Sequence, residues 1–158
     1  MGEVTVPFSR GSGSPEPRSA ALAALDPRFR GGTDEAPGLR FAGYAAVFDC
    51  ADRGGDVVRA GAFGAVGPVP LLWQHVGAPV GVIEQAGEDA RGLRVIGRID
   101  DARLAGLVRS GAVSGLSFGY RVKVAARGRY RELTALDLVE VSLVAQPMQP
   151  LARVHAIA

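Results

Sequence analysis

The stretch "VSGLSFGYRVKV", residues 113–124, decides the fold class of this chain. Apolar side chains alternate along it with small or polar ones: Leu116, Phe118, Tyr120, Val122 and Val124 against Ser117, Gly119, Arg121 and Lys123. Because successive side chains of a strand point to opposite faces of a sheet, this period of two predicts a strand with one face in the core. The polar stretch "AARGRYRE" follows and predicts a hairpin tip, after which the chain returns through "LTALDLVEVSLVAQP".

Shorter strand signals lie on the N-terminal side of this hairpin. "LRFAGYAAVFD" (39–49) is rich in aromatic and apolar residues. "VPLLWQH" (69–75) and "PVGVIEQ" (79–85) are separated by "VGA", which we interpret as a tight connection. "GLRVIGRI" (92–99) alternates again, and the turn-rich link before it predicts a hairpin over residues 79–99.

One helix interrupts the strands. "DARLAGLVRSG" places Leu104, Leu107 and Val108 at helical spacing, which gives a narrow apolar stripe. Asp100 or Asp101 can cap its N-terminus, and Gly111 can supply the left-handed residue after its end. Six or seven short strands with one helix predict a mainly antiparallel β-barrel or sandwich.

The length and composition suit one domain. At 158 residues the chain can bury a sizeable core. Residues 1–38 are dominated by Gly, Ser, Pro, Arg and Ala and have no long apolar period, so we expect a flexible leader there. The folded domain is expected over residues 39–154, and residues 155–158 form a short tail.

Charge, hydropathy and cysteine content exclude several classes of function. The formal net charge is +2, with 18 Lys and Arg scattered among 16 acids, which argues against direct nucleic-acid binding. No apolar run approaches the roughly 18 residues that a membrane span needs. The single cysteine, Cys50, excludes an intrachain disulfide and CxxC zinc sites. Its acidic neighbours Asp49 and Asp52 disfavour a thiolate, so we interpret Cys50 as structural.

Ser117 is the candidate nucleophile. On the predicted strand it faces away from Leu116 and Phe118, with Gly115 and Gly119 on its own side, and these small residues would leave room for a substrate backbone. A serine hydroxyl needs a neighbouring base to take its proton. The alternative is a strand serine on a solvated face. Ser114 is a rival candidate, but a structural role in the turn after the helix explains that residue.

His75 is the candidate base, because the imidazole side chain titrates near neutral pH. Its alternative role is to fill the core and bond a backbone carbonyl. His155 lies four residues from the end of the sequence, where chains fray, and is a weaker candidate. Trp73 is interpreted as a core residue.

Glu140 is the candidate third group. It interrupts the apolar run "LDLVEVSLV", and on a strand it would share a face with Leu138 and Ser142. A carboxylate that faces a core needs a partner, and orienting a histidine would provide one. The alternatives are an edge-strand glutamate that faces water, and Asp137 as the third group instead.

Seven collinear segments resemble the prohead maturation proteases of tailed bacteriophages and their relatives in prophages and gene-transfer agents. They cover about residues 39–150. In order they read "FAGYAAVFD", "GDVVRAGAF", "PLLWQH", "PVGV", "GLRVIGRI", "GAVSGLSFGYR" and "LVEVSLVAQP". The family's catalytic histidine falls on His75, its nucleophile on Ser117 and its acidic position on Glu140.

The resemblance implies a small antiparallel β-barrel with peripheral helices, similar to the herpesvirus assembly protease. It implies a serine endopeptidase that works as a homodimer or an assembly inside the procapsid, in the bacterial cytoplasm, without a cofactor or metal. The expected substrates are the scaffolding protein, the scaffold-like segment of the major capsid protein, and the enzyme itself. The alternative is a catalytically decayed barrel that binds capsid or scaffold protein during assembly.

Overall fold

The computed structural model describes residues 38–158, so nearly all of the expected leader lies outside the described part. None of the helices in residues 38–158 has the length and apolar character needed to cross a membrane. The elements follow in the order β1 (Leu39–Val47), β2 (Asp56–Val58), β3 (Val69–Trp73), β4 (Val76–Glu88), β5 (Gly92–Ile99), α2 (Ala102–Arg109), β6 (Gly115–Arg127), β7 (Arg131–Val144) and β8 (Val154–Ile157).

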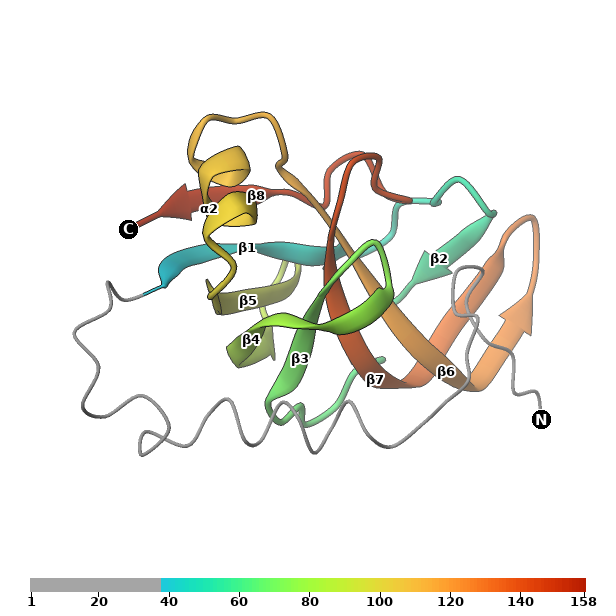
Figure 1. Cartoon of the computed structure of the whole chain (residues 1–158). Helices are drawn as coiled ribbons and strands as arrows, with labels where there is room; N and C mark the ends of the chain where they lie inside the picture. Colours follow the sequence, from blue (N-terminus) through green and yellow to red (C-terminus); the bar gives the residue numbers. More distant parts are fainter. Residues whose placement is uncertain (1–37) are drawn as a thin grey trace.

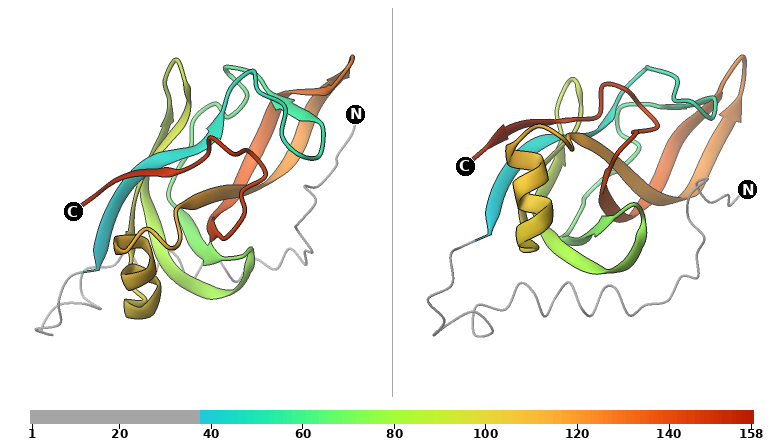
Figure 2. Two further views of the ribbon diagram at one scale, coloured as in Figure 1. Left: turned by 90° about the horizontal axis from the view of Figure 1, so that it is seen from above. Right: turned by 45° about the horizontal axis from the view of Figure 1, so that its top comes forward.

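The strands form one curled sheet in the order β2-β7-β3-β4-β5-β1-β8, with β6 paired to β7. The prediction of a mainly β fold with a short helix is confirmed, and the sheet curls into a half-barrel (Figure 1). In both views of Figure 2 the helix α2 lies at one end of the molecule near β8, and the tip of the β6–β7 hairpin lies at the other end. Two pairings are parallel, those of β7 with β2 and with β3.

The alternation that predicted β6 holds over most of its length. Leu116, Phe118 and Tyr120 are buried in the core, as is Val122. Val124 is 53% exposed, so the prediction that it also faces the core is wrong. The reason is that β6 and β7 extend beyond the core as a hairpin, and both faces meet solvent toward its tip.

The helix α2 begins and ends as the sequence indicates. The side chain of Asp101 accepts a hydrogen bond from the amide of Leu104 and caps the N-terminus. After the last turn Gly111 has a φ of 83°, which a glycine adopts without the steric cost of a Cβ. Leu104, Ala105 and Val108 are buried against the sheet.

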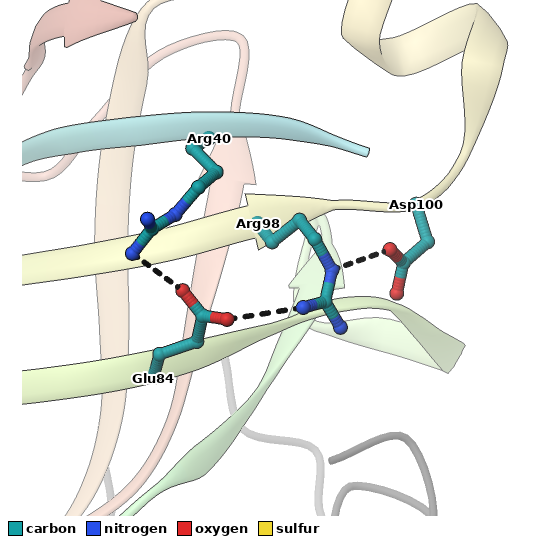
Figure 3. A network of polar contacts seen from close by, with 4 residues as sticks. All are labelled: Arg40, Glu84, Arg98 and Asp100. Carbon is teal, nitrogen blue, oxygen red and sulfur yellow. Dashed lines mark hydrogen bonds and ion pairs between the residues drawn. The ribbon is translucent and has the colours of Figure 1, made fainter. Parts of the chain in front are cut away.

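A chain of ion pairs connects β1, β4 and the end of β5 (Figure 3). Glu84 accepts from Arg40 and Arg98 at 3.0 Å each, and Arg98 also donates to Asp100 at 2.8 Å. The side chain of Arg98, in the middle of this series of ion pairs, is 15% exposed and shielded from water. The side chain of Arg40, at one end of the series, is mostly exposed. The network thus joins side chains of three neighbouring strands and of the segment that leads into α2.

Candidate active site

The connection between β3 and β4 carries His75. Trp73 pairs with Val76, so the turn consists of Gln74 and His75 alone. Both residues have a left-handed backbone, with φ values of 55° and 66°, the pattern of a type I′ hairpin turn. The prediction that residues 76–78 form the connection is therefore wrong. The sequence did not reveal the turn because positions 74 and 75 lack the Asn and Gly that usually mark one of this type.

Three hydrogen bonds hold this turn against β7 and the residue that follows it. The amide of Gln74 donates to the carbonyl of Leu143 at 2.9 Å, and the Gln74 side chain accepts from the amide of Ala145 at 2.7 Å. The amide of His75 donates to Oγ of Ser142 at 3.1 Å. The position of the imidazole therefore depends on β7, although β7 lies more than fifty residues further along the chain.

A bulge in β7 sets the direction of Glu140. Glu140 pairs with Gly119 and Leu138 pairs with Tyr120, which leaves Val139 as an extra residue in β7. Because Gly119 and Tyr120 are adjacent in β6 and face opposite ways, Glu140 and Leu138 lie on opposite faces. The prediction that they share a face is wrong, since the bulge breaks the period of two.

Glu140 and His75 contact each other in a nearly dry site. The distance from Nδ1 of His75 to Oε2 of Glu140 is 2.6 Å, and the two side chains are 6% and 10% exposed. A carboxylate can only accept, so we assign the proton to Nδ1, which leaves Nε2 as the basic nitrogen. The other oxygen of Glu140, Oε1, accepts from Oγ of Ser142 at 2.7 Å. The predicted pairing of a buried glutamate with a histidine is what the structure contains.

Ser117 lies in β6 directly opposite Ser142 and is 7% exposed. Directly opposed residues of an antiparallel pair point to the same side, so Ser117 shares the face of Ser142 and Glu140. A Cβ at Gly119 would overlap with the carboxylate of Glu140. The space beside Gly119 is thus filled by Glu140, which corrects the expectation that this glycine leaves room for a substrate backbone.

Asp137, the alternative third group, lies elsewhere. Its side chain is 60% exposed, and its carboxylate is 3.6 Å from the ammonium of Lys123 across the hairpin. The contact with His75 is made by Glu140, three residues further along β7. Of the two acids, only the buried one is positioned to orient an imidazole.

The other two candidates have local partners. Oγ of Ser114 accepts a hydrogen bond from Arg153 at 3.0 Å, at the exit from α2. His155 lies in β8, and its ring meets the ring of Tyr44 edge to face at a centroid distance of 5.6 Å. Neither contact supplies a base to a nucleophile.

Cys50 and Trp73 have no part in the hydrogen bonds of the site. Cys50 is a free, half-buried thiol, and Trp73 packs against the core. Within residues 38–158, no three His, Cys, Asp or Glu side chains are grouped so that they could hold a metal ion. The polar side chains of the site are thus those of two serines, a histidine, a glutamate and the glutamine of the turn, Gln74.

Two residues of this site were not predicted, Ser142 and Gln74. Ser142 had a signal, because it follows Glu140 by two positions on a strand and so shares its face. Gln74 had none, since glutamine is not a residue type that marks left-handed turns. Their hydrogen bonds to His75, Glu140 and Ala145 are tertiary contacts that a pattern along the chain does not contain.

Comparison with known proteins gives the class of this molecule. The family model for caudovirus prohead serine proteases matches residues 29–158. Among solved structures, the KSHV protease in complex with a hexapeptide phosphonate inhibitor is similar at 14% identity, with a TM-score of 0.47. The similarity covers 77% of this chain and 65% of that protease, so the chain spans less than two thirds of the length of that protease. No curated protein sequence matches the chain.

The chain belongs to the caudovirus prohead serine protease family, as the resemblance in its sequence predicted. The description of this family is that of serine proteases of the caudovirus prohead.

Proposed function

We propose that this chain is a serine protease of phage capsid maturation, with Ser117 as the nucleophile, His75 as the general base and Glu140 as the carboxylate that orients the base. The observation that carries this proposal is the contact of 2.6 Å between Nδ1 of His75 and Oε2 of Glu140. It directs the basic Nε2 away from the carboxylate. Ser142, which bonds both His75 and Glu140, is the residue directly opposite Ser117.

The reaction would proceed through an acyl-enzyme. Oγ of Ser117 attacks the scissile carbonyl carbon while Nε2 of His75 takes the hydroxyl proton. The tetrahedral intermediate collapses as the imidazolium gives this proton to the leaving amine, and water then attacks the ester by the same route. Glu140 stays ionised throughout and stabilises the imidazolium. Backbone N–H groups would stabilise the oxyanion, at about 2.7–4 kcal/mol for one donor in a well-studied serine protease.

The proposed substrates are the scaffolding protein or the scaffold-like segment of the major capsid protein, and the protease itself. The family membership supports a capsid substrate in the prohead. We further propose that the protease works as a homodimer or an assembly inside the procapsid, in the bacterial cytoplasm. Self-cleavage within residues 1–38 is part of the same proposal and concerns residues that lie almost entirely outside the described part.

Co-expression with the cognate capsid and scaffold proteins tests the assignment. Ser117→Ala should abolish processing, because no nucleophile remains to form the acyl-enzyme. Ser114→Ala is the matched control, since Ser114 is close in sequence but bonded to Arg153 at the helix exit, and processing should continue. Processing by Ser117→Ala at the normal rate would refute the proposal.

A serine-directed phosphonate probe separates an active protease from a decayed binding module. Labelling of the protein should require both Ser117 and His75, because the probe reacts only with an activated hydroxyl. A protein that binds capsid protein but remains unlabelled would be a binding module.

A further inference from the structure

Ser142 is a fully buried hydroxyl at the centre of the site. It is 0% exposed, and its strand β7 lies between β6 and β3, where its neighbours in register are Ser117 and Leu72. A buried hydroxyl needs hydrogen-bond partners, and Ser142 has two. It bonds Oε1 of Glu140 at 2.7 Å and the amide of His75 at 3.1 Å.

The direction of both hydrogen bonds follows from the partners. An ionised carboxylate can only accept and a backbone N–H can only donate. The one proton of Ser142 therefore points to Glu140, and a lone pair receives the amide of His75. Because this proton is committed to a carboxylate, Ser142 does not present it to the imidazole. The two serines that face each other across β6 and β7 thus have different roles, and Ser117 is the one left to react.

The turn that carries the imidazole needs such an anchor. A left-handed backbone costs a residue other than glycine roughly 1–2 kcal/mol, and both Gln74 and His75 adopt it. Contacts from outside the turn must hold this conformation. Gln74 is held by Leu143 and Ala145 through its own hydrogen bonds, whereas the amide of His75 is held by Ser142.

We propose that Ser142 is a positioning residue, which ties the backbone of His75 and the carboxylate of Glu140 to one hydroxyl. His75 is then held at two points, since Ser142 bonds its backbone amide and Glu140 bonds Nδ1 of its imidazole. Glu140 is in turn held by both His75 and Ser142. Nε2 stays directed as the chemistry requires when the substrate enters. This inference rests on the proposed function of Ser117, His75 and Glu140.

Two variants at position 142, with threonine and with valine, test the role of the hydroxyl group, because the two side chains have almost the same shape. Ser142→Thr keeps the hydroxyl and Ser142→Val replaces it with a methyl group, while both add the same bulk. For cleavage of a peptide that spans a capsid processing site, we expect kcat of Ser142→Val to be about 100-fold below that of Ser142→Thr. KM should be similar for the two, because Ser142 is buried and does not touch substrate.

A spectroscopic signal distinguishes positioning from loss of structure. The Nδ1 proton of His75, held by Glu140 at 2.6 Å, should give a far-downfield proton resonance in the wild type and in Ser142→Thr. It should be broadened or lost in Ser142→Val while the remaining spectrum is kept. Equal kcat values and equal resonances in the two variants would overturn the inference.

A smaller variant covers the case in which the added bulk unfolds both proteins. Ser142→Ala fits the site without a clash, and it should lower kcat by a similar factor and remove the downfield resonance. An unchanged kcat in Ser142→Ala would overturn the inference.

Ser117→Ala separates the two proposals: if it remains active, the proposed function itself fails. If it is inactive while the Ser142 variants are normal, only the positioning role fails.

Discussion

Glu140 and Asp137 lie three residues apart, yet burial gives them different chemistry. The side chain of Glu140 is 10% exposed and contacts His75, whereas Asp137 is 60% exposed and lies beside Lys123. Glu140→Gln removes the charge that stabilises the imidazolium, so kcat should fall by about 10²- to 10⁴-fold with little change in KM. Steady-state cleavage of a capsid-site peptide measures this effect.

The matched control is Asp137→Asn, which removes an equal charge from the same strand. Its exposed pair with Lys123 is worth little, so activity should stay within about twofold of the wild type. A larger loss in Asp137→Asn than in Glu140→Gln would identify Asp137 as the orienting acid.

At the scale of single residues, the sequence predicted a partner for Glu140 but not the contacts that hold His75 beside it. The cost of burying a carboxylate makes a pairing necessary, and the position of Glu140 in an apolar run indicated burial. The left-handed backbone of Gln74 and His75 was not predictable, because it is imposed by hydrogen bonds to Ser142, Leu143 and Ala145. These contacts exist only after β3 has paired with β7.

Among the elements, α2 offers a test of the backbone alone. Gly106 lies inside the helix and Gly111 lies after its end with a φ of 83°, and a Cβ at either position would meet nothing within 4 Å. Gly106→Ala should raise the free energy of unfolding by about 0.5–1 kcal/mol, because alanine favours the helix. Gly111→Ala should lower it by about 1 kcal/mol, because the left-handed region penalises a side chain. Denaturant unfolding of the two variants should give shifts of opposite sign.

Shifts of the same sign would contradict this interpretation of the C-terminal cap. Neither glycine belongs to the candidate site, so the peptidase activity of the two variants should match that of the wild type at temperatures where both are folded.

The periodicity of the strands predicted their presence better than their partners. The β4–β5 and β6–β7 hairpins could be predicted, since neighbours in sequence pair across short turns. The parallel pairing of β7 with β2 and β3 could not, because no local pattern specifies a partner some seventy residues away. The bulge at Val139 was hidden for the same reason: it exists only relative to the register of β6.

At the scale of the whole molecule, β7 is the strand on which the site and the fold both depend. It pairs with β2, β3 and β6, and it carries Glu140 and Ser142. Near its start Arg131 donates two hydrogen bonds to the buried carboxylate of Asp56, to which Tyr120 also donates. Burial, with the nearby charge of Asp56, raises the pKa of Tyr120 well above its ordinary value of 10.0. This cluster joins β2, β6 and β7 at the end of the sheet opposite α2.

At the other end of the strand order, β8 covers the edge of β1. Phe41 and Ala42 of β1 pair with Ile157 and Ala156, and Arg40 and Ala158 exchange two backbone hydrogen bonds at 3.2 and 2.9 Å. An uncovered edge strand offers its free N–H and C=O groups to other chains. The short β8 is thus the outer strand of the sheet, and it covers the edge of the longer β1.

Truncation after Arg153 would expose that edge. The free energy of unfolding should fall by about 2 kcal/mol, from the lost hydrogen bonds and the uncovered face of β1. Light scattering across a range of concentrations should show more association than for the full chain. Ile157→Thr is the matched control, because this side chain is 42% exposed and its replacement keeps the backbone pairing. If the truncated chain were as stable as the control and associated no more strongly, β8 would not protect the edge of β1.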